Sequence, residues 1–119
     1  CYNTMRKMGI RLAAGSDLPI ESPKVMEAIQ VSVTRKNLSG WPEGGWHPEE
    51  AFDVLDAVKL HTVNGAYVSK DENKYGSIEV GKQANFVLLS GDVFEVEKDK
   101  IKDIEILETY IDGESVYKK

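Results

Sequence analysis

The stretch from Ile10 to Pro19 constrains the fold more than any other part of this sequence. Its apolar start, residues 10–14, predicts a short buried strand, and two small residues end this strand directly before Asp17. Pro19 prevents the strand from continuing inside a sheet. A carboxylate at the carboxyl end of a buried strand is a usual catalytic position in α/β enzymes. The alternative is that Asp17 only caps a turn, because aspartate is a common turn residue.

Composition places the chain among soluble globular proteins, with 41% hydrophobic and 29% charged residues. The net charge of −5 argues against a nucleic-acid or anionic membrane partner. No apolar run approaches the roughly 20 residues that span a bilayer, so we expect no membrane segment. The only cysteine, Cys1, excludes an internal disulfide. With no secretory signal at the start of the sequence, the cytoplasm is the default expectation.

Apolar periodicity predicts helices in the first half of the chain. Residues 1–9 have the composition of a helix end. Residues 24–36 follow a Ser-Pro start and carry an apolar stripe, which we assign to the core. Pro48 begins the next helix, with an apolar stripe formed by Ala51, Val54, Leu55 and Val58.

The segment from Thr62 to Ser69 leaves two structures open. Asn64-Gly65 between apolar runs is typical of a hairpin turn, whereas Thr62 could equally cap a short helix. Beyond residues 69–74 the sequence favours strands, and we place a boundary there. The elements predicted after it are strands at 84–89 and 93–96, a charged connection at 99–103, and a hairpin of 106–111 with 115–117 around Asp112-Gly113.

A loop rich in glycine and tryptophan occupies residues 37–47. Glycine and proline interrupt both helices and strands here, and the two indoles, Trp41 and Trp46, are costly to leave in water. Either the indoles pack onto the body of the protein, or they cover a substrate entrance. Trp41 and Trp46 are therefore candidate substrate-binding residues.

The two histidines, His47 and His61, lack the spacing of metal ligands such as H-x-H or H-E-x-x-H. We interpret them as a cap residue and a helix-end partner rather than as ligands. The sequence also contains no phosphate loop and no nucleophile elbow.

Several motifs stand at characteristic distances along the chain: Gly9-Ile10 running into Ala14-Gly15-Ser16-Asp17-Leu18-Pro19, then Pro48-Glu49-Glu50, Thr62-Val63-Asn64-Gly65-Ala66-Tyr67, Gly76-Ser77-Ile78-Glu79-Val80-Gly81-Lys82-Gln83-Ala84-Asn85-Phe86-Val87-Leu88-Leu89 and Val116-Tyr117. Together they resemble the C-terminal end of the amidohydrolase superfamily, in the branch that includes N-substituted formamide deformylases and YtcJ-like amidohydrolases. The resemblance runs from the first residues to the last. Its most specific feature is the G-S-D-x-P element coupled to the G-S-I-x-x-G-K-x-A element.

The resemblance implies an α/β fold that is the C-terminal fragment of a (β/α)8 metal-dependent hydrolase barrel. Residues 1–70 would hold the last barrel strand and its flanking helices, and residues 71–119 would supply strands of a small β-sandwich subdomain. Thr62–Tyr67 would then be helical. Asn85 departs from the family, which usually has aspartate after Lys-x-Ala, and we interpret that position as structural.

The resemblance also implies the chemistry. The full-length protein would be a metal-dependent amidohydrolase that uses a metal-activated water to hydrolyse a C–N bond in a small-molecule amide-type substrate. Asp17 would be the catalytic proton shuttle and would approach a divalent metal ion, for which zinc is the expected species. The remaining ligands are expected upstream of Cys1. By itself the chain should neither hold metal tightly nor turn over substrate.

Two other classes of function stay open beside the hydrolase. The first is a non-catalytic module in which the β-rich half serves oligomerisation or docking, and a homo-oligomer is compatible with it. The second is a cytosolic regulator that has kept the fold and lost the activity.

Overall fold

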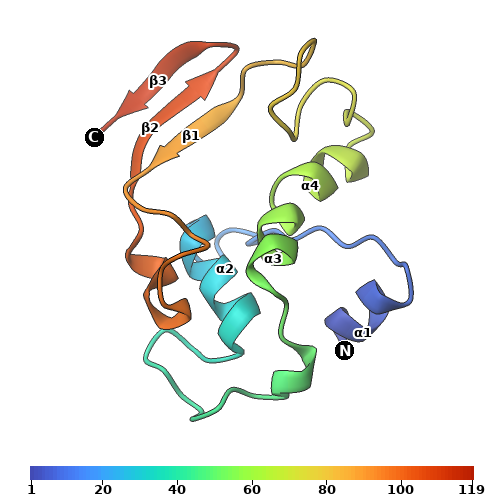
Figure 1. Cartoon of the computed structure of the whole chain (residues 1–119), viewed down its shortest axis with the longest axis vertical. Coiled ribbons are helices and arrows are strands. Elements are labelled where there is room, and N and C mark those ends of the chain that lie inside the picture. The colour runs from blue at the N-terminus through green and yellow to red at the C-terminus, as the bar shows by residue number, and fades with distance from the viewer.

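Helices occupy the first part of the chain and a small sheet lies near its end (Figure 1). This computed structural model describes all 119 residues. The four α-helices are α1 (Tyr2–Lys7), α2 (Val25–Thr34), α3 (Val54–Leu60) and α4 (Val63–Val68). Two 3₁₀ helices are η1 (Pro48–Glu50) and η2 (Lys98–Asp103), and the strands are β1 (Phe86–Leu89), β2 (Ile106–Ile111) and β3 (Glu114–Lys118).

The predicted helices α1 and α2 are confirmed, and the helix predicted from Pro48 is split in two. The 3₁₀ helix η1 ends at Glu50, and α3 begins after Asp53, whose carboxylate accepts a hydrogen bond from the Asp56 amide at 2.7 Å. This break rotates the apolar stripe. Leu55 is therefore half exposed, whereas Leu60 is buried.

The segment after Thr62 is helical, as the family resemblance implied and against the hairpin alternative. The α4 helix follows α3 almost directly and supports the loop that carries the G-S-I-x-x-G-K motif. Gly76 has a φ of +100°, and a Cβ there would lie 2.7 Å from the Cβ of Ala66 on α4. The first glycine of the motif is therefore required by the close approach of the loop to the helix.

The sheet is antiparallel in the order β1-β2-β3. The predicted hairpin of β2 and β3 is confirmed, and Asp112 and Gly113 both take positive φ values, of 53° and 82°, as a tight hairpin turn requires. Asn85 has the structural role that the sequence suggested, because its side-chain oxygen accepts a hydrogen bond from the Asp112 amide at 2.8 Å.

One prediction between β1 and β2 is wrong. Residues 93–96 form a turn instead of a strand, because the Asp92 carboxylate accepts the Phe94 amide at 2.8 Å and folds the chain back. The charged connection at 99–103 is part of η2. Its one apolar residue, Ile101, is fully buried, and this contact holds the charged segment in a helical turn.

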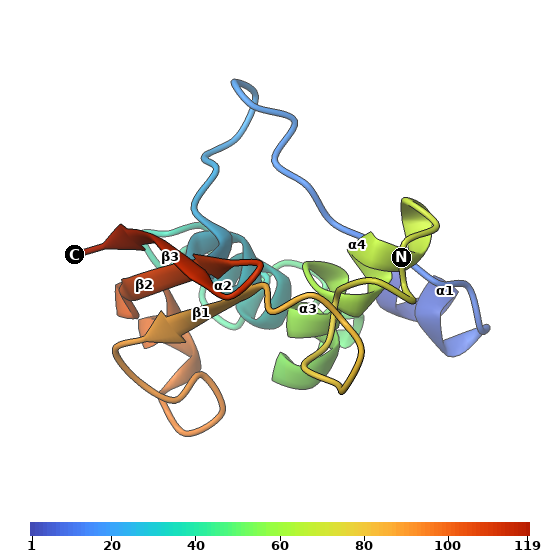
Figure 2. The same cartoon turned by 90° about the horizontal axis from the view of Figure 1, so that it is seen from above.

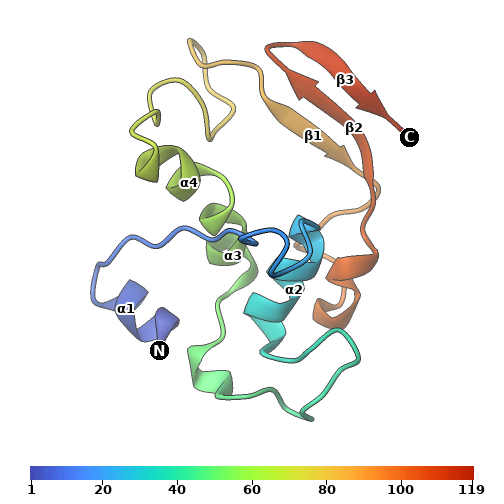
Figure 3. The ribbon, with the colours of Figure 1, turned by 180° about the vertical axis from the view of Figure 1, so that it is seen from behind.

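The hydrophobic core lies where α2, α3 and η2 meet (Figures 1 and 3). It therefore contains residues from both sides of the boundary predicted at 69–74, and the division into 1–70 and 71–119 stays a prediction. The core residues are Ile29, Val33, Phe52, Ala57, Leu60, Val93, Ile101 and Ile104.

None of the helices combines the length and the apolar character needed to cross a bilayer.

Candidate functional site

Residues 10–16 form neither helix nor strand, so the strand predicted at 10–14 is wrong in this structure. The segment runs across α3 (Figure 3), where the Ala14 amide donates to the Leu60 carbonyl at 3.1 Å. The Asn64 side-chain amide also donates to the Leu12 carbonyl, at 2.8 Å. A strand needs a neighbouring strand to complete its ladder, and no other segment of the chain supplies one here.

Asp17 begins a turn on a loop that stands away from the body of the protein (Figure 2). Its φ is 48°, a left-handed conformation that aspartate tolerates better than most residues. Two backbone hydrogen bonds close the turn, from Ile20 N to the Asp17 carbonyl at 2.9 Å and from Glu21 N to the Ser16 carbonyl at 3.1 Å. The turn is thus held by backbone hydrogen bonds and does not use the side chain of Asp17.

The carboxylate of Asp17 is exposed and takes part in no hydrogen bond and no ion pair of the structure. A turn-capping aspartate would accept a backbone amide through its side chain, as Asp53 does at the start of α3. Asp17 does not act in this way. Its oxygens are free to accept a proton or to approach a cation.

A metal ion needs more than this one carboxylate. No three histidine, cysteine, aspartate or glutamate side chains come together in a group that could hold a metal. The residues of this chain therefore do not fit a metal ion by themselves. Asp17 as a ligand stays a prediction for a longer protein that would supply the other ligands.

The structure exposes both tryptophans, which is against the alternative that they pack onto the body. Trp41 is 72% exposed and Trp46 is 64% exposed. The loop is instead closed at its base, where Trp46 N donates to the Arg35 carbonyl at 2.8 Å and Arg35 Nε donates to the Trp46 carbonyl at 3.1 Å. Because α2 separates this loop from the Asp17 loop, the two lie at opposite ends of a ten-residue helix, about 15 Å long.

The histidines occupy helix ends, as predicted, and neither joins Asp17. His47 is the N-cap residue of η1, and its Nδ1 lies 2.8 Å from Glu49 Oε1. This hydrogen bond lowers the pKa of Glu49. His61 is the C-cap residue of α3, and its Nε2 is buried without a hydrogen-bond partner. Burial lowers the pKa of His61, because the charged imidazolium would lose its hydration.

The structure also contains a polar cavity of about 310 Å³ that the sequence did not indicate. Its basic side chains, Arg11, Lys59 and Lys82, come from three distant parts of the chain. No local motif links these positions, so only the packing of the 10–12 segment and the 71–82 loop around α3 and α4 brings them together.

Comparisons with known proteins match nearly the whole chain. The family model described as "Amidohydrolase family" covers residues 2–117. The chain is 35% identical over 118 residues to "Putative amidohydrolase YtcJ" of Bacillus subtilis, covering 99% of this chain and 22% of that protein. It is 30% identical over 116 residues to the N-substituted formamide deformylase of Arthrobacter pascens, covering 98% of this chain and 21% of that protein.

A solved structure agrees with the sequence relatives. An amidohydrolase from Thermotoga maritima superposes with a TM-score of 0.62 and 28% identity, over 97% of this chain and 25% of that one. The chain thus spans about a fifth of the length of the curated relatives that it matches.

The buried imidazole of His61 predicts a loss of stability in acid. The unfolded chain keeps the ordinary pKa of 6.5, whereas the folded pKa is lower. As the pH falls below 6.5, the unfolded chain takes up a proton first, so the free energy of unfolding should fall until the pH has passed the folded pKa. Well above 6.5, where the imidazole is neutral in both states, the residue should contribute no pH dependence.

Urea unfolding at a series of pH values tests this for the wild type and for His61→Gln, which cannot titrate. The wild type should lose more stability than the variant on the acid side. If the unfolding free energies of the two proteins run parallel over the whole pH range, the pKa of His61 is the same in the folded and the unfolded chain, and the prediction is wrong.

Proposed function

The chain belongs to the amidohydrolase family, and we propose that it forms the C-terminal part of an enzyme that hydrolyses a C–N bond of amide type. The observation that carries the proposal is the free carboxylate of Asp17, which stands in the G-S-D-x-P element on the projecting loop. Family membership supports the hydrolase class. The free carboxylate supports a chemical role for this residue.

Asp17 would move one proton twice. Hydrolysis of an amide needs a base that takes a proton from the attacking water and an acid that protonates the leaving nitrogen. An exposed, unpaired carboxylate can do both in turn: one oxygen accepts the proton, and the same group then donates it to the amine. The turn presents this group without using it for its own hydrogen bonds.

The relatives support the choice of the first substrate to test. One of them is named an N-substituted formamide deformylase, so an N-substituted formamide is the first compound to assay. A divalent metal ion, with zinc as the expected species, belongs to the proposal for the longer protein only, because the residues of this chain do not fit one by themselves. The cytoplasm stays the proposed compartment.

Trp41 and Trp46 remain proposed substrate contacts, with a narrower role than the sequence suggested. Their loop follows α2 and the Asp17 loop precedes it, so a substrate whose reacting bond lies at Asp17 must extend past the length of α2 to reach the indoles. The indoles would therefore touch a part of the substrate that is remote from the reacting bond. Both side chains are exposed enough to do so.

A non-catalytic docking or oligomerisation module is the second candidate, and one face of the sheet favours it. Thr109 pairs with Val87 on one side and with Tyr117 on the other. Ile111 lies two positions away along β2 and so shares this face. All three of these apolar side chains, Val87, Tyr117 and Ile111, are exposed, which is typical of a surface that another polypeptide covers.

Replacement of the carboxylate tests the catalytic proposal. In the longer protein, Asp17→Asn should lower kcat/KM for an N-substituted formamide by about 10²–10⁴-fold, because the amide cannot accept the proton. Asparagine tolerates the left-handed backbone of this position, so the turn should be kept.

The matched control is Asp103→Asn, which removes an exposed carboxylate that is paired only with Lys100 at 3.8 Å. It should leave kcat/KM unchanged. Full activity of Asp17→Asn would contradict the catalytic role and would favour the docking module.

The tryptophans are tested separately. If the indoles contact a remote part of the substrate, Trp41→Ala or Trp46→Ala should raise KM by up to about tenfold and leave kcat unchanged, because binding is lost equally in the ground state and the transition state. Phe94→Ala is the control, since Phe94 is an exposed aromatic residue on a different loop. Unchanged KM with lowered stability would mean that the indoles serve only the structure of their loop.

A further inference from the structure

The polar cavity lies between the 10–12 segment, α3, α4 and the loop that leads to the G-S-I-x-x-G-K motif. Its volume is about 310 Å³, enough for a small molecule, and a neighbouring hollow of about 200 Å³ shares three of its residues. We call the larger one the basic cavity. Its lining consists of Arg11, Lys59, Val63, Asn64, Glu72, Tyr75 and Lys82.

Three cationic side chains and one carboxylate line the basic cavity, in a chain whose net charge is −5. The cavity therefore carries a local excess of positive charge, although the chain as a whole is negatively charged. Such an excess in a concave surface attracts anions more strongly than the same charges spread over a convex one.

Arg11 carries the least compensated of these charges. Its guanidinium lies 4.0 Å from the centre of the Tyr67 ring, and it forms no ion pair. Lys59 is 3.9 Å from Asp56, but that carboxylate is engaged by Arg6 at 2.6 Å. Stacking on an aromatic ring leaves the edge of a guanidinium, with its N–H groups, free for an oxyanion.

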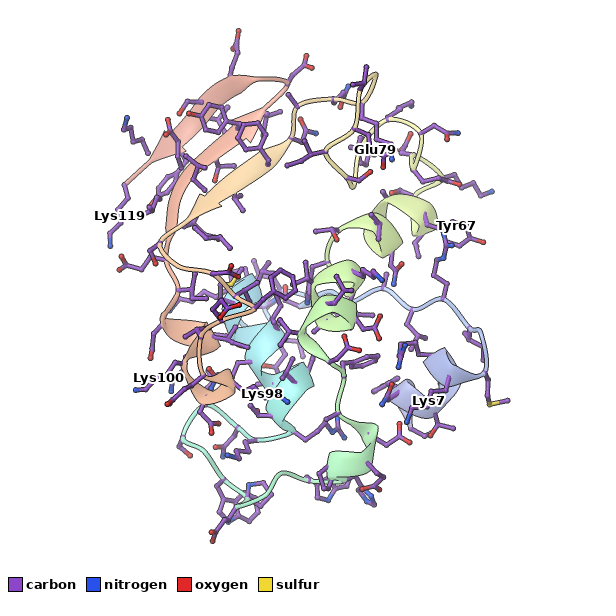
Figure 4. All side chains as sticks on the ribbon, in the orientation of Figure 1. Lys7, Tyr67, Glu79, Lys98, Lys100 and Lys119 are labelled. Carbon is purple, nitrogen blue, oxygen red and sulfur yellow. The ribbon has the colours of Figure 1, made fainter.

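Two other side chains that line the cavity, Lys82 and Tyr75, are fixed by hydrogen bonds to neighbouring residues. Lys82 Nζ donates to Ser77 Oγ at 2.7 Å and lies 3.3 Å from Glu79. The Tyr75 hydroxyl donates to Asp71 at 2.7 Å. Figure 4 labels Tyr67 on α4 and Glu79 on the adjoining loop, the two elements that frame this region. These hydrogen bonds hold the cavity in shape, while N–H donors of Arg11 and Lys59 stay available to a ligand.

We propose that the basic cavity binds a small oxyanion that carries two negative charges, of phosphate or dicarboxylate type, through Arg11 and Lys59. Charge-assisted hydrogen bonds from these two groups supply the affinity, and the guanidinium supplies the match to paired oxygens. Glu72 lines the same cavity, forms no ion pair and opposes the anion by repulsion.

The site is separate from Asp17. The 10–12 segment is fixed against α4 by the hydrogen bond from Asn64 to the Leu12 carbonyl. Asp17 belongs to the turn of residues 17–20, in the loop that stands away from the body of the protein between this segment and α2 (Figure 2). A ligand here occupies the base of the loop that carries Asp17. It therefore does not compete with a substrate at the carboxylate.

Calorimetric titration of the 119-residue chain at low ionic strength tests the proposal, with inorganic phosphate and succinate as the probes. Phosphate should bind saturably at one site. Arg11→Gln should weaken binding by about tenfold, the effect of one charge-assisted hydrogen bond. Glu72→Gln should strengthen binding, because a repelling charge is removed.

The matched control is Arg35→Gln, since Arg35 also lies over an aromatic ring, 5.6 Å from that of Trp46, but outside the cavity. It should leave binding unchanged. The gain expected for Glu72→Gln cannot arise from misfolding, so the test does not depend on the stability of Arg11→Gln. Saturable succinate binding at the same site would place the dicarboxylates among the ligands, and binding of phosphate alone would restrict the site to phosphate-type anions.

The proposal fails if neither anion binds saturably. It also fails if Arg11→Gln and Arg35→Gln weaken binding equally, or if Glu72→Gln leaves it unchanged, because each result would mean that the cavity itself does not hold the anion.

Discussion

The packing of α2 against η2 is the interaction on which the rest of this structure depends. Ile29 on α2 and Ile101 on η2 are both almost completely buried, and each buried side chain of this size contributes about 1.5–3 kcal/mol. Gln30 is buried beside them, and its side-chain oxygen accepts the amide of Lys102 at 2.9 Å. A segment from the helical half and one from the β-rich half are thereby joined in one core.

This core also determines how the Asp17 loop is presented. The loop begins where the 10–14 segment is bonded to Leu60 and Asn64, and it ends where α2 enters the core. Both of its ends are therefore fixed, while its middle projects into solvent (Figure 2). A reactive side chain on an exposed loop with fixed ends is a frequent arrangement in enzymes, because the scaffold sets position and the loop gives access.

Local patterns predicted the elements whose stabilising contacts are local. The apolar stripe located α2, and Asp112-Gly113 located the hairpin. The strand predicted at 10–14 needed a neighbouring strand, and the chain supplies none. The strand predicted at 93–96 is replaced by a turn, which the side chain of Asp92 sets locally. The exposure of the indoles could not be decided from the sequence, since hydrophobicity gives no information on whether a loop reaches the core.

Of the two candidate sites, one could be found from the sequence and the other could not. Asp17 could be found from the sequence because its motif is contiguous, and the structure adds that its carboxylate is unpaired. The basic cavity could not be found, because Arg11, Lys59 and Lys82 meet only after the chain has folded. The family itself was recognisable from the coupled motifs, one of which contains a glycine that the contact with α4 requires.

Chemical rescue tests the central claim, proton transfer by Asp17, most directly. Asp17→Gly keeps the left-handed backbone and removes the carboxylate, so added formate can occupy its place in the longer enzyme. If Asp17 moves the proton, activity toward an amide that is not itself a formamide should rise saturably with formate in this variant and not in the wild type. An inactive, folded Asp17→Gly enzyme that formate does not restore would contradict the account.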